Sequence, residues 1–186
     1  MPQRPASVTV FAIIDIVMAV LGVFGIAWMI IDRMGLIQFD NSQNPVAQAM
    51  EDNRAYVLFT EVASWLGIVA TVAVLCAAIG MLQLKNWARL TAIAWAVYST
   101  VMTALGAVMN YVLIFGPVIR DTTGPERIGM IVGMVFMIVI TLAFMVFFLL
   151  QVYFLTRPKV VEAFRLAAEF EQQRDADVTA SAGDRL

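Results

Sequence analysis

Residues 128–156 read IGMIVGMVFMIVITLAFMVFFLLQVYFLT, and this run indicates the class of protein. It contains no charged side chain, and Arg127 and Arg157 stand immediately outside it. A helix rises about 1.5 Å per residue, so about 20 apolar residues cross a hydrocarbon core that is about 30 Å thick. The stretch is therefore long enough to span a bilayer as a helix. Membrane strands alternate apolar and polar side chains, whereas this run is continuously apolar.

Three further segments have the same character. The chain between Arg89 and Arg120 carries no charge, and two earlier apolar runs carry one acid each, Asp15 and Glu61. In lipid, backbone groups must be satisfied internally, and a helix does this within each span. The predicted spans cover about residues 8–31, 56–84, 88–116 and 127–156. The first run follows Arg4 like a signal peptide, but it is longer than the 7–15 residues of a cleaved apolar region, so we expect it to be retained.

The composition supports a membrane protein and excludes several other classes. Hydrophobic residues make up 61% of the chain and charged residues 14%, against about 45–50% and about 25% in soluble domains. A net charge of -2 argues against a nucleic-acid partner, which needs a basic face. The chain has no histidine and a single cysteine, Cys76, which excludes intrachain disulfides, His-ligated haem and most zinc sites. We expect neither a cofactor nor a metal.

The predicted fold is an all-α membrane protein with four transmembrane helices in an antiparallel bundle, formed by residues 1–156. A tight hairpin at Lys85-Asn86-Trp87 makes the second and third spans antiparallel neighbours. Asn44-Pro45 is a helix-start signal, a cap followed by proline, so a short outer helix should precede the second span.

The segment after the fourth span has a different pattern. Residues 157–174 place apolar and polar side chains on opposite faces, which predicts an amphipathic cytoplasmic helix at the membrane surface. Residues 175–186 lack apolar periodicity, and we expect a disordered tail there.

The distribution of lysine and arginine predicts the orientation, since cytoplasmic loops are enriched in both. One side of the predicted bundle carries Arg4, Lys85, Arg89, Arg157 and Lys159, and the other carries Arg33, Arg54, Arg120 and Arg127. The bias predicts a multi-pass protein with both termini in the cytoplasm.

Small residues at helical spacing mark candidate packing faces, because helices in lipid associate where backbones approach closely. These candidates are Ala92, Ala96, Thr100 and Ala104 in the third span and Gly129 and Gly133 in the fourth. We expect them to pack within one bundle. The alternative for the glycine pair is a seam between two copies in a homo-oligomer.

Polar groups within or beside the spans are candidate functional residues. Asp15 lies about 10 Å along a helix from Val8, near the inner boundary, and we expect a structural contact with Arg89. The alternative is a protonatable coupling residue. Glu61 should lie at the outer boundary with Asn110 in a polar cluster. The two acids lie near opposite faces and cannot form an acid/base pair, so an enzyme is not expected.

Two stretches carry a resemblance to known proteins. The hairpin reads GMLQLKNWAR at residues 80–89, and the end of the last span reads YFLTRPKVVEAF at residues 153–164. Both resemble small bacterial four-span membrane proteins of uncharacterised families, which implies the bacterial inner (plasma) membrane but no activity. Four spans with an acid in the first are also similar to small multidrug-resistance transporters, from which the long first outer loop and the amphipathic tail depart.

Three functions fit these observations. The leading hypothesis is a non-enzymatic structural or accessory component of a membrane assembly. Its expected partners are membrane lipids, together with other proteins or further copies of this chain in a homo-oligomer. The first alternative is a small oligomeric transporter or channel, which needs a polar path. The second is a lipid- or quinone-binding protein that uses gaps between methionine-rich helices.

Overall fold

The computed structural model describes residues 5–36 and 44–183, without the side chains of residue 175 and residues 177–183. Every regular element in this part of the chain is a helix. The elements are α1 (Ala6–Arg33), α2 (Pro45–Asp52), α3 (Arg54–Leu82), α4 (Asn86–Met109), the π-helix η1 (Asn110–Phe115), α5 (Gly116–Asp121), α6 (Pro125–Leu155) and α7 (Pro158–Gly183). The all-α prediction is confirmed.

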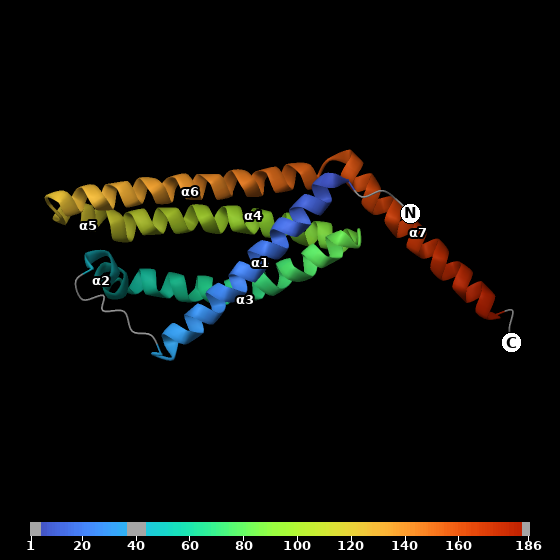
Figure 1. Cartoon of the computed structure of the whole chain (residues 1–186), viewed down its shortest axis with the longest axis horizontal. Helices are drawn as coiled ribbons and strands as arrows, with labels where there is room; N and C mark the ends of the chain where they lie inside the picture. Colours follow the sequence, from blue (N-terminus) through green and yellow to red (C-terminus); the bar gives the residue numbers. More distant parts are fainter. Residues whose placement is uncertain (1–4, 37–43, 184–186) are drawn as a thin grey trace.

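Four helical segments are long and apolar enough to cross a membrane. They are Ala6–Arg33, Arg54–Leu82, Asn86–Asp121 and Pro125–Leu155. The third comprises α4, η1 and α5 in one rod, so it continues past Gly116-Pro117, where the sequence predicted its end. The four segments pack antiparallel, as expected, and Figure 1 shows α4 and α6 side by side along their length.

The turn between α3 and α4 is tight and is closed by backbone hydrogen bonds. The Lys85 N–H donates to the Gly80 carbonyl at 2.9 Å, and the Leu84 N–H donates to the Met81 carbonyl at 3.0 Å. Leu84 has φ 56°, the left-handed conformation that ends many helices. The predicted hairpin is confirmed, although α4 already begins at Asn86.

The short helix before the second span begins where the sequence predicted. The Asn44 side chain accepts hydrogen bonds from Val46 N and Ala47 N at 3.1 and 3.3 Å, and Pro45 opens α2. Asn53 then caps α3 by accepting from Tyr56 N at 3.0 Å. The second cap separates α2 from α3, so α2 folds back against η1 and α5.

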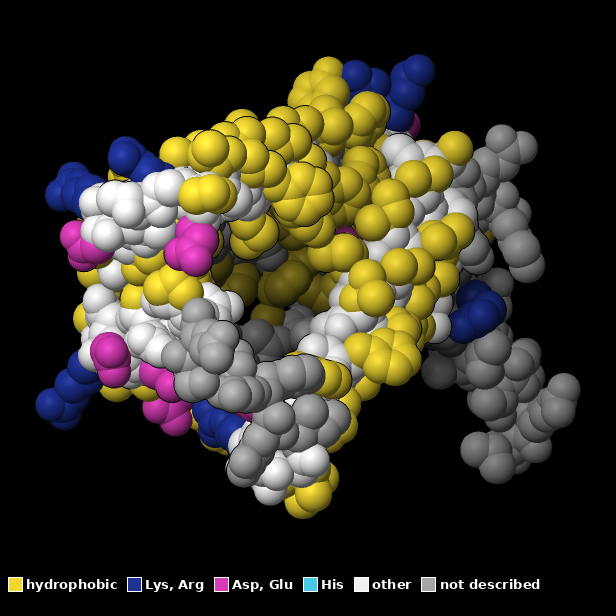
Figure 2. All heavy atoms as spheres, turned by 60° about the vertical axis from the view of Figure 1, so that its left-hand side comes forward, with side chains coloured by type: hydrophobic (Ala, Val, Ile, Leu, Met, Phe, Trp, Pro, Cys, Tyr) yellow, Lys and Arg dark blue, Asp and Glu magenta, His cyan; other side chains and the backbone are white. Residues whose placement is uncertain are grey.

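The two ends of the bundle are packed differently. The buried apolar cluster gathers where α7 begins, and its members are Val8, Ala12, Met81, Leu84, Ala88, Ala92, Leu155, Val160 and Phe164. From this α7 end, α1 runs obliquely across α3 and away from α6 (Figure 1). The face turned towards the α2 end is hollowed at its centre, and hydrophobic side chains are seen inside the hollow (Figure 2). The bundle is therefore tight at the α7 end and open at the α2 end.

Helix α7 closes the tight end. Phe164 and Val160 are buried in the apolar cluster, and Lys85 Nζ pairs with Glu171 Oε1 at 2.7 Å. The helix continues to Gly183, beyond the predicted boundary at Arg174 and into the segment expected to be disordered. No glycine or proline interrupts the chain between Pro158 and Gly183, so nothing local ends the helix earlier. Residues 184–186 of the expected tail lie outside the described residues.

Candidate functional site

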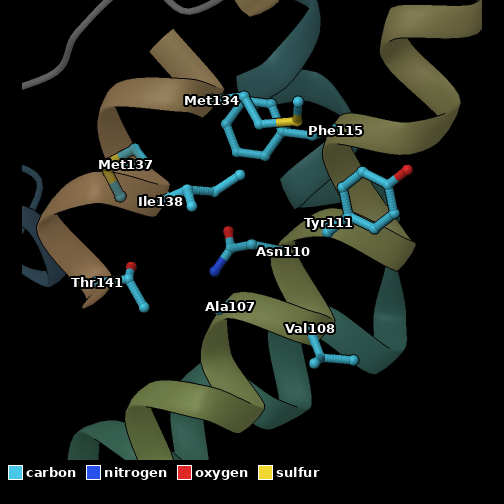
Figure 3. A pocket seen from close by; sticks show the side chains of 9 residues that line it. All are labelled: Ala107, Val108, Asn110, Tyr111, Phe115, Met134, Met137, Ile138 and Thr141. Carbon is cyan, nitrogen blue, oxygen red and sulfur yellow. The ribbon is translucent and has the colours of Figure 1, made fainter. Parts of the chain in front are cut away.

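An apolar cavity of about 350 Å³ lies between the third and fourth spans. Its lining comes from the end of α4, from η1 and from α6: Ala107, Val108, Asn110, Tyr111, Phe115, Met134, Met137, Ile138 and Thr141 (Figure 3). Ligand sites typically occupy about 300–1,000 Å³ and combine apolar walls with a few placed polar groups. This cavity has that composition, with Asn110 and Thr141 among apolar neighbours.

The cavity lies beside the π-helix, and the local sequence explains why the helix widens there. Pro117 has no N–H to donate, and a proline ring clashes with the carbonyl four residues earlier, at Leu113. Between Asn110 and Phe115 the helix is widened to a π-helix, and this moves the Leu113 carbonyl away from its position in a regular α-helix. Gly116 permits the change, since a Cβ there would stand 2.9 Å from the Tyr111 carbonyl oxygen.

Asn110 is held in a fixed orientation at the edge of the cavity. Its Oδ1 accepts from the Tyr56 hydroxyl at 3.1 Å, and its Nδ2 donates to the Gly106 carbonyl at 2.9 Å. An amide has two N–H groups and two lone pairs, so one of each is left for a ligand. The pairing with Tyr56 links α3 to η1.

Thr141 adds a second polar group from the opposite wall. The hydroxyls of Thr71 and Thr100 donate to backbone carbonyls four residues earlier, each at 2.8 Å. The Thr141 hydroxyl has no hydrogen-bond partner among the described residues. Asn110 and Thr141 together offer donors that suit a carbonyl or hydroxyl oxygen on an otherwise apolar molecule.

A second cavity, of about 480 Å³, separates α1 from α6. It is lined by Ile14, Met18, Ile140, Ala143, Phe144 and Phe147. Apart from backbone groups, this lining has no hydrogen-bonding side chain, so the cavity offers apolar contacts alone.

Asp15 lies at the contact between α1 and α6, and its partner differs from the expectation. Its Oδ2 accepts from Gln151 Nε2 at 2.7 Å, and the two residues are 2% and 0% exposed. Phe11, one turn earlier on α1, packs against Phe147 and Phe154 of α6. The expected contact with Arg89 is corrected, because the fourth span supplies the partner.

Arg89 instead lies at the junction with α7. Its guanidinium carbon is 5.9 Å from the centroid of the Phe164 ring, and its Nε is buried without a hydrogen-bond partner. The side chain therefore packs against α7, on which Phe164 is fully buried.

Glu61 and Asn110 do not meet. Glu61 Oε1 lies 3.8 Å from Arg33 Nη2, and the Arg33 guanidinium carbon is 5.9 Å from the Trp65 ring centroid. The expected cluster of Glu61 with Asn110 is corrected to two separate contacts, Glu61 with Arg33 and Asn110 with Tyr56. About half of each side chain in the Arg33–Glu61 pair is exposed, and such pairs contribute little stability.

The candidate packing residues divide into two groups. Ala92 and Ala96 are buried, and Thr100 and Ala104 are partly buried farther along α4. Gly129 and Gly133 are exposed, and a Cβ at either position would meet nothing within 4 Å. The small residues of α4 therefore pack inside the bundle, whereas the two glycines lie on an outer face of α6.

Two features of the site were not identified from the sequence. Gln151 stands in an uncharged run, where a lone amide on the face of Phe147 and Phe154 was the available signal. The cavity at η1 had a weaker signal, a Gly-Pro pair inside an apolar segment. Among the side chains that the structure describes, no three His, Cys, Asp or Glu residues come together as metal ligands.

Comparison with known proteins leaves the family open. No family model, no curated protein and no solved structure matches this chain. On its own architecture, the chain is an integral membrane protein with four spans.

Proposed function

We propose that this protein is a non-enzymatic membrane protein that binds an apolar, lipid-like molecule in the cavity between η1 and α6. The observation that carries the proposal is the cavity itself, apolar in its walls, with Asn110 and Thr141 facing it from two spans. π-Helices occur frequently at functional sites, and η1 forms one wall.

The lining indicates the chemistry of the ligand. No charged side chain lines the cavity, so a charged head group would lose its hydration without gaining a partner. A neutral carbonyl or hydroxyl can accept or donate at Asn110 and Thr141. Flexible side chains at Met134 and Met137 can adapt to an irregular apolar body. A quinone meets these requirements, with its carbonyl at the polar pair and its ring and tail among apolar side chains.

The location follows from the charge bias and the resemblance of the two edge motifs. We place the protein in a bacterial inner membrane with both termini in the cytoplasm. The α7 end then faces the cytoplasm, and the open α2 end lies in the outer leaflet. A reporter fused after Leu186 should be active in the cytoplasm, and activity confined to the periplasm would overturn this orientation.

The test of ligand binding uses a cavity-filling variant. Decyl-ubiquinone is added to protein purified in mild detergent, and thermal unfolding is followed. A ligand at 100 times its Kd stabilises the folded state by about 2.7 kcal/mol. We expect wild-type protein to be stabilised and Ile138→Trp to lose the effect, because the larger side chain occupies the cavity.

Val139→Trp is the matched control, since Val139 is next in sequence and exposed but does not line the cavity. It should respond like wild type. Equal stabilisation of the Ile138 and Val139 variants would contradict binding in this cavity. Dioleoylphosphatidylglycerol, added in place of the quinone, distinguishes a neutral head group from an anionic one.

A second candidate is an accessory component of a membrane assembly, and the glycine face of α6 favours it. Gly129 and Gly133 leave open space on a membrane-exposed helix, where a span of another protein could approach closely. Copurification in mild detergent should then retain a partner that Gly133→Leu releases. A stable species without any partner would argue against this role.

A small oligomeric transporter or channel has less support. Among the described residues, the buried polar side chains are Asp15, Ser99 and Gln151. Asp15 and Gln151 are bonded to each other and do not line either cavity described above. A polar path would have to come from several chains together.

A further inference from the structure

The contact between Asp15 and Gln151 leaves two oxygen atoms without partners. Gln151 Nε2 donates to Asp15 Oδ2 at 2.7 Å. Asp15 Oδ1 and Gln151 Oε1 are both buried and have no hydrogen-bond partner. Buried polar atoms without partners are rare in folded proteins, and a pair of them on two bonded residues requires an explanation.

The chemistry of the two groups shows what is missing. An ionised carboxylate has acceptors alone, and the amide oxygen of glutamine is also an acceptor. With Asp15 ionised, Asp15 Oδ1 and Gln151 Oε1 are therefore both acceptors, and no donor lies between them. A protonated carboxyl group has one O–H donor. A proton on Oδ1 would donate to Oε1 and satisfy both oxygens, closing a two-bond ring between acid and amide.

Within the part of the chain that the structure describes, the charged side chains do not offer another solution. In the turn after α6, Arg157 lies over the rings of Tyr153 and Phe154. On α4, Arg89 lies over Phe164, and Lys85 at the turn before α4 pairs with Glu171 of α7.

The remaining charged groups on the neighbouring spans are also engaged or distant in sequence. Glu61 of α3 pairs with Arg33 at the far end of α1. None of the described cations forms an ion pair with Asp15. An ionised Asp15 would be an unpaired charge inside a membrane span, which is costly.

We propose that Asp15 and Gln151 form a proton-binding site in which Asp15 Oδ1 carries a proton and donates to Gln151 Oε1. The proton comes from solvent and forms one O–H bond, so no other bond changes. Two hydrogen bonds then join α1 to α6, beside the packing of Phe11 on Phe147 and Phe154. Loss of the proton would remove one bond and leave a charge at the contact. The site thus couples proton occupancy to the attachment of α1 to α6, independently of the proposed ligand cavity.

Infrared spectroscopy tests the proposal directly, because protonated and ionised carboxyl groups absorb at different frequencies. Spectra of wild type and Asp15→Asn are subtracted at neutral pH, with the protein in lipid vesicles. We expect the difference to contain the C=O stretch of a protonated carboxyl group. A difference containing carboxylate bands alone would overturn the proposal. Glu61→Gln is the control, and its difference should show carboxylate bands because Glu61 is exposed beside Arg33.

Gln151→Leu provides a second measurement if Asp15→Asn does not fold. Removing the amide deletes both hydrogen bonds of the ring, so the acid C=O stretch should move to higher frequency or be replaced by carboxylate bands. A carboxyl spectrum identical to that of wild type would overturn the proposed pair.

Discussion

Gly80 shows at the residue scale how closely α3 and α4 approach. A Cβ at this position would stand 2.6 Å from the Ala88 Cβ and 3.0 Å from the Trp87 ring. The first distance is shorter than real side chains tolerate, and Ala88 is buried against the same turn. The absence of a side chain at Gly80 therefore sets the spacing of the hairpin.

Gly80→Ala should destabilise the protein even though alanine favours helices. Overpacking of a filled core costs about 1–3 kcal/mol, more than the roughly 1 kcal/mol that alanine gains over glycine in a helix. Thermal unfolding in detergent measures the outcome. Gly106→Ala is the control, since a Cβ there meets nothing within 4 Å, and it should be neutral or stabilising. A Gly80 variant as stable as the Gly106 variant would refute the close contact.

For Asp15, the sequence predicts the level in the membrane but not the neighbouring side chain. The helical rise gives the level of a residue in its span, and this identified Asp15 as a residue near one end of the bundle. The rise does not give the neighbour, because Arg89 of the third span and Gln151 of the fourth both lie at the same end. The arrangement of the helices decides between them, and it brings Gln151 to Asp15.

At the scale of elements, the spans follow from the sequence and η1 does not. A run of apolar residues between charges fixes the length of each span, so all four were predicted to within a few residues at most boundaries. The third is longer because Pro117 widens the helix without ending it. The clash of a proline ring can be relieved by a kink, a break or a π-turn, and the sequence does not choose among them.

Pro117→Ala should convert η1 to regular α-helix and weaken ligand binding. The variant restores the backbone N–H at residue 117 and removes the ring clash, so the widened turn loses its cause. We expect decyl-ubiquinone to stabilise this variant less than wild type in thermal unfolding, while the unliganded protein still folds.

Pro125→Ala is the corresponding control for a proline at a helix start. Pro125 opens α6, where its missing N–H would have no partner in any case. This variant should bind like wild type. If decyl-ubiquinone stabilised the Pro117 variant as much as wild type, ligand binding would not depend on the π-helix.

At the scale of the whole molecule, the antiparallel four-span arrangement was predictable and the asymmetry of its packing was not. In a soluble protein, apolar side chains mark the buried face, but in a bilayer the lipid-facing surface is equally apolar. The distribution of apolar side chains along α6 therefore does not show which face of the helix packs against another span. Tight packing at the α7 end and separation at the α2 end emerge when the spans are placed together (Figures 1 and 2).

The most direct test of the account is an experimental structure of the protein in lipid nanodiscs supplemented with decyl-ubiquinone. We predict a ligand between η1 and α6, with a carbonyl oxygen within hydrogen-bonding distance of Asn110 or Thr141 and its ring against Ile138. A cavity filled by the protein's own side chains, or spans packed as tightly at the α2 end as at the α7 end, would contradict the account.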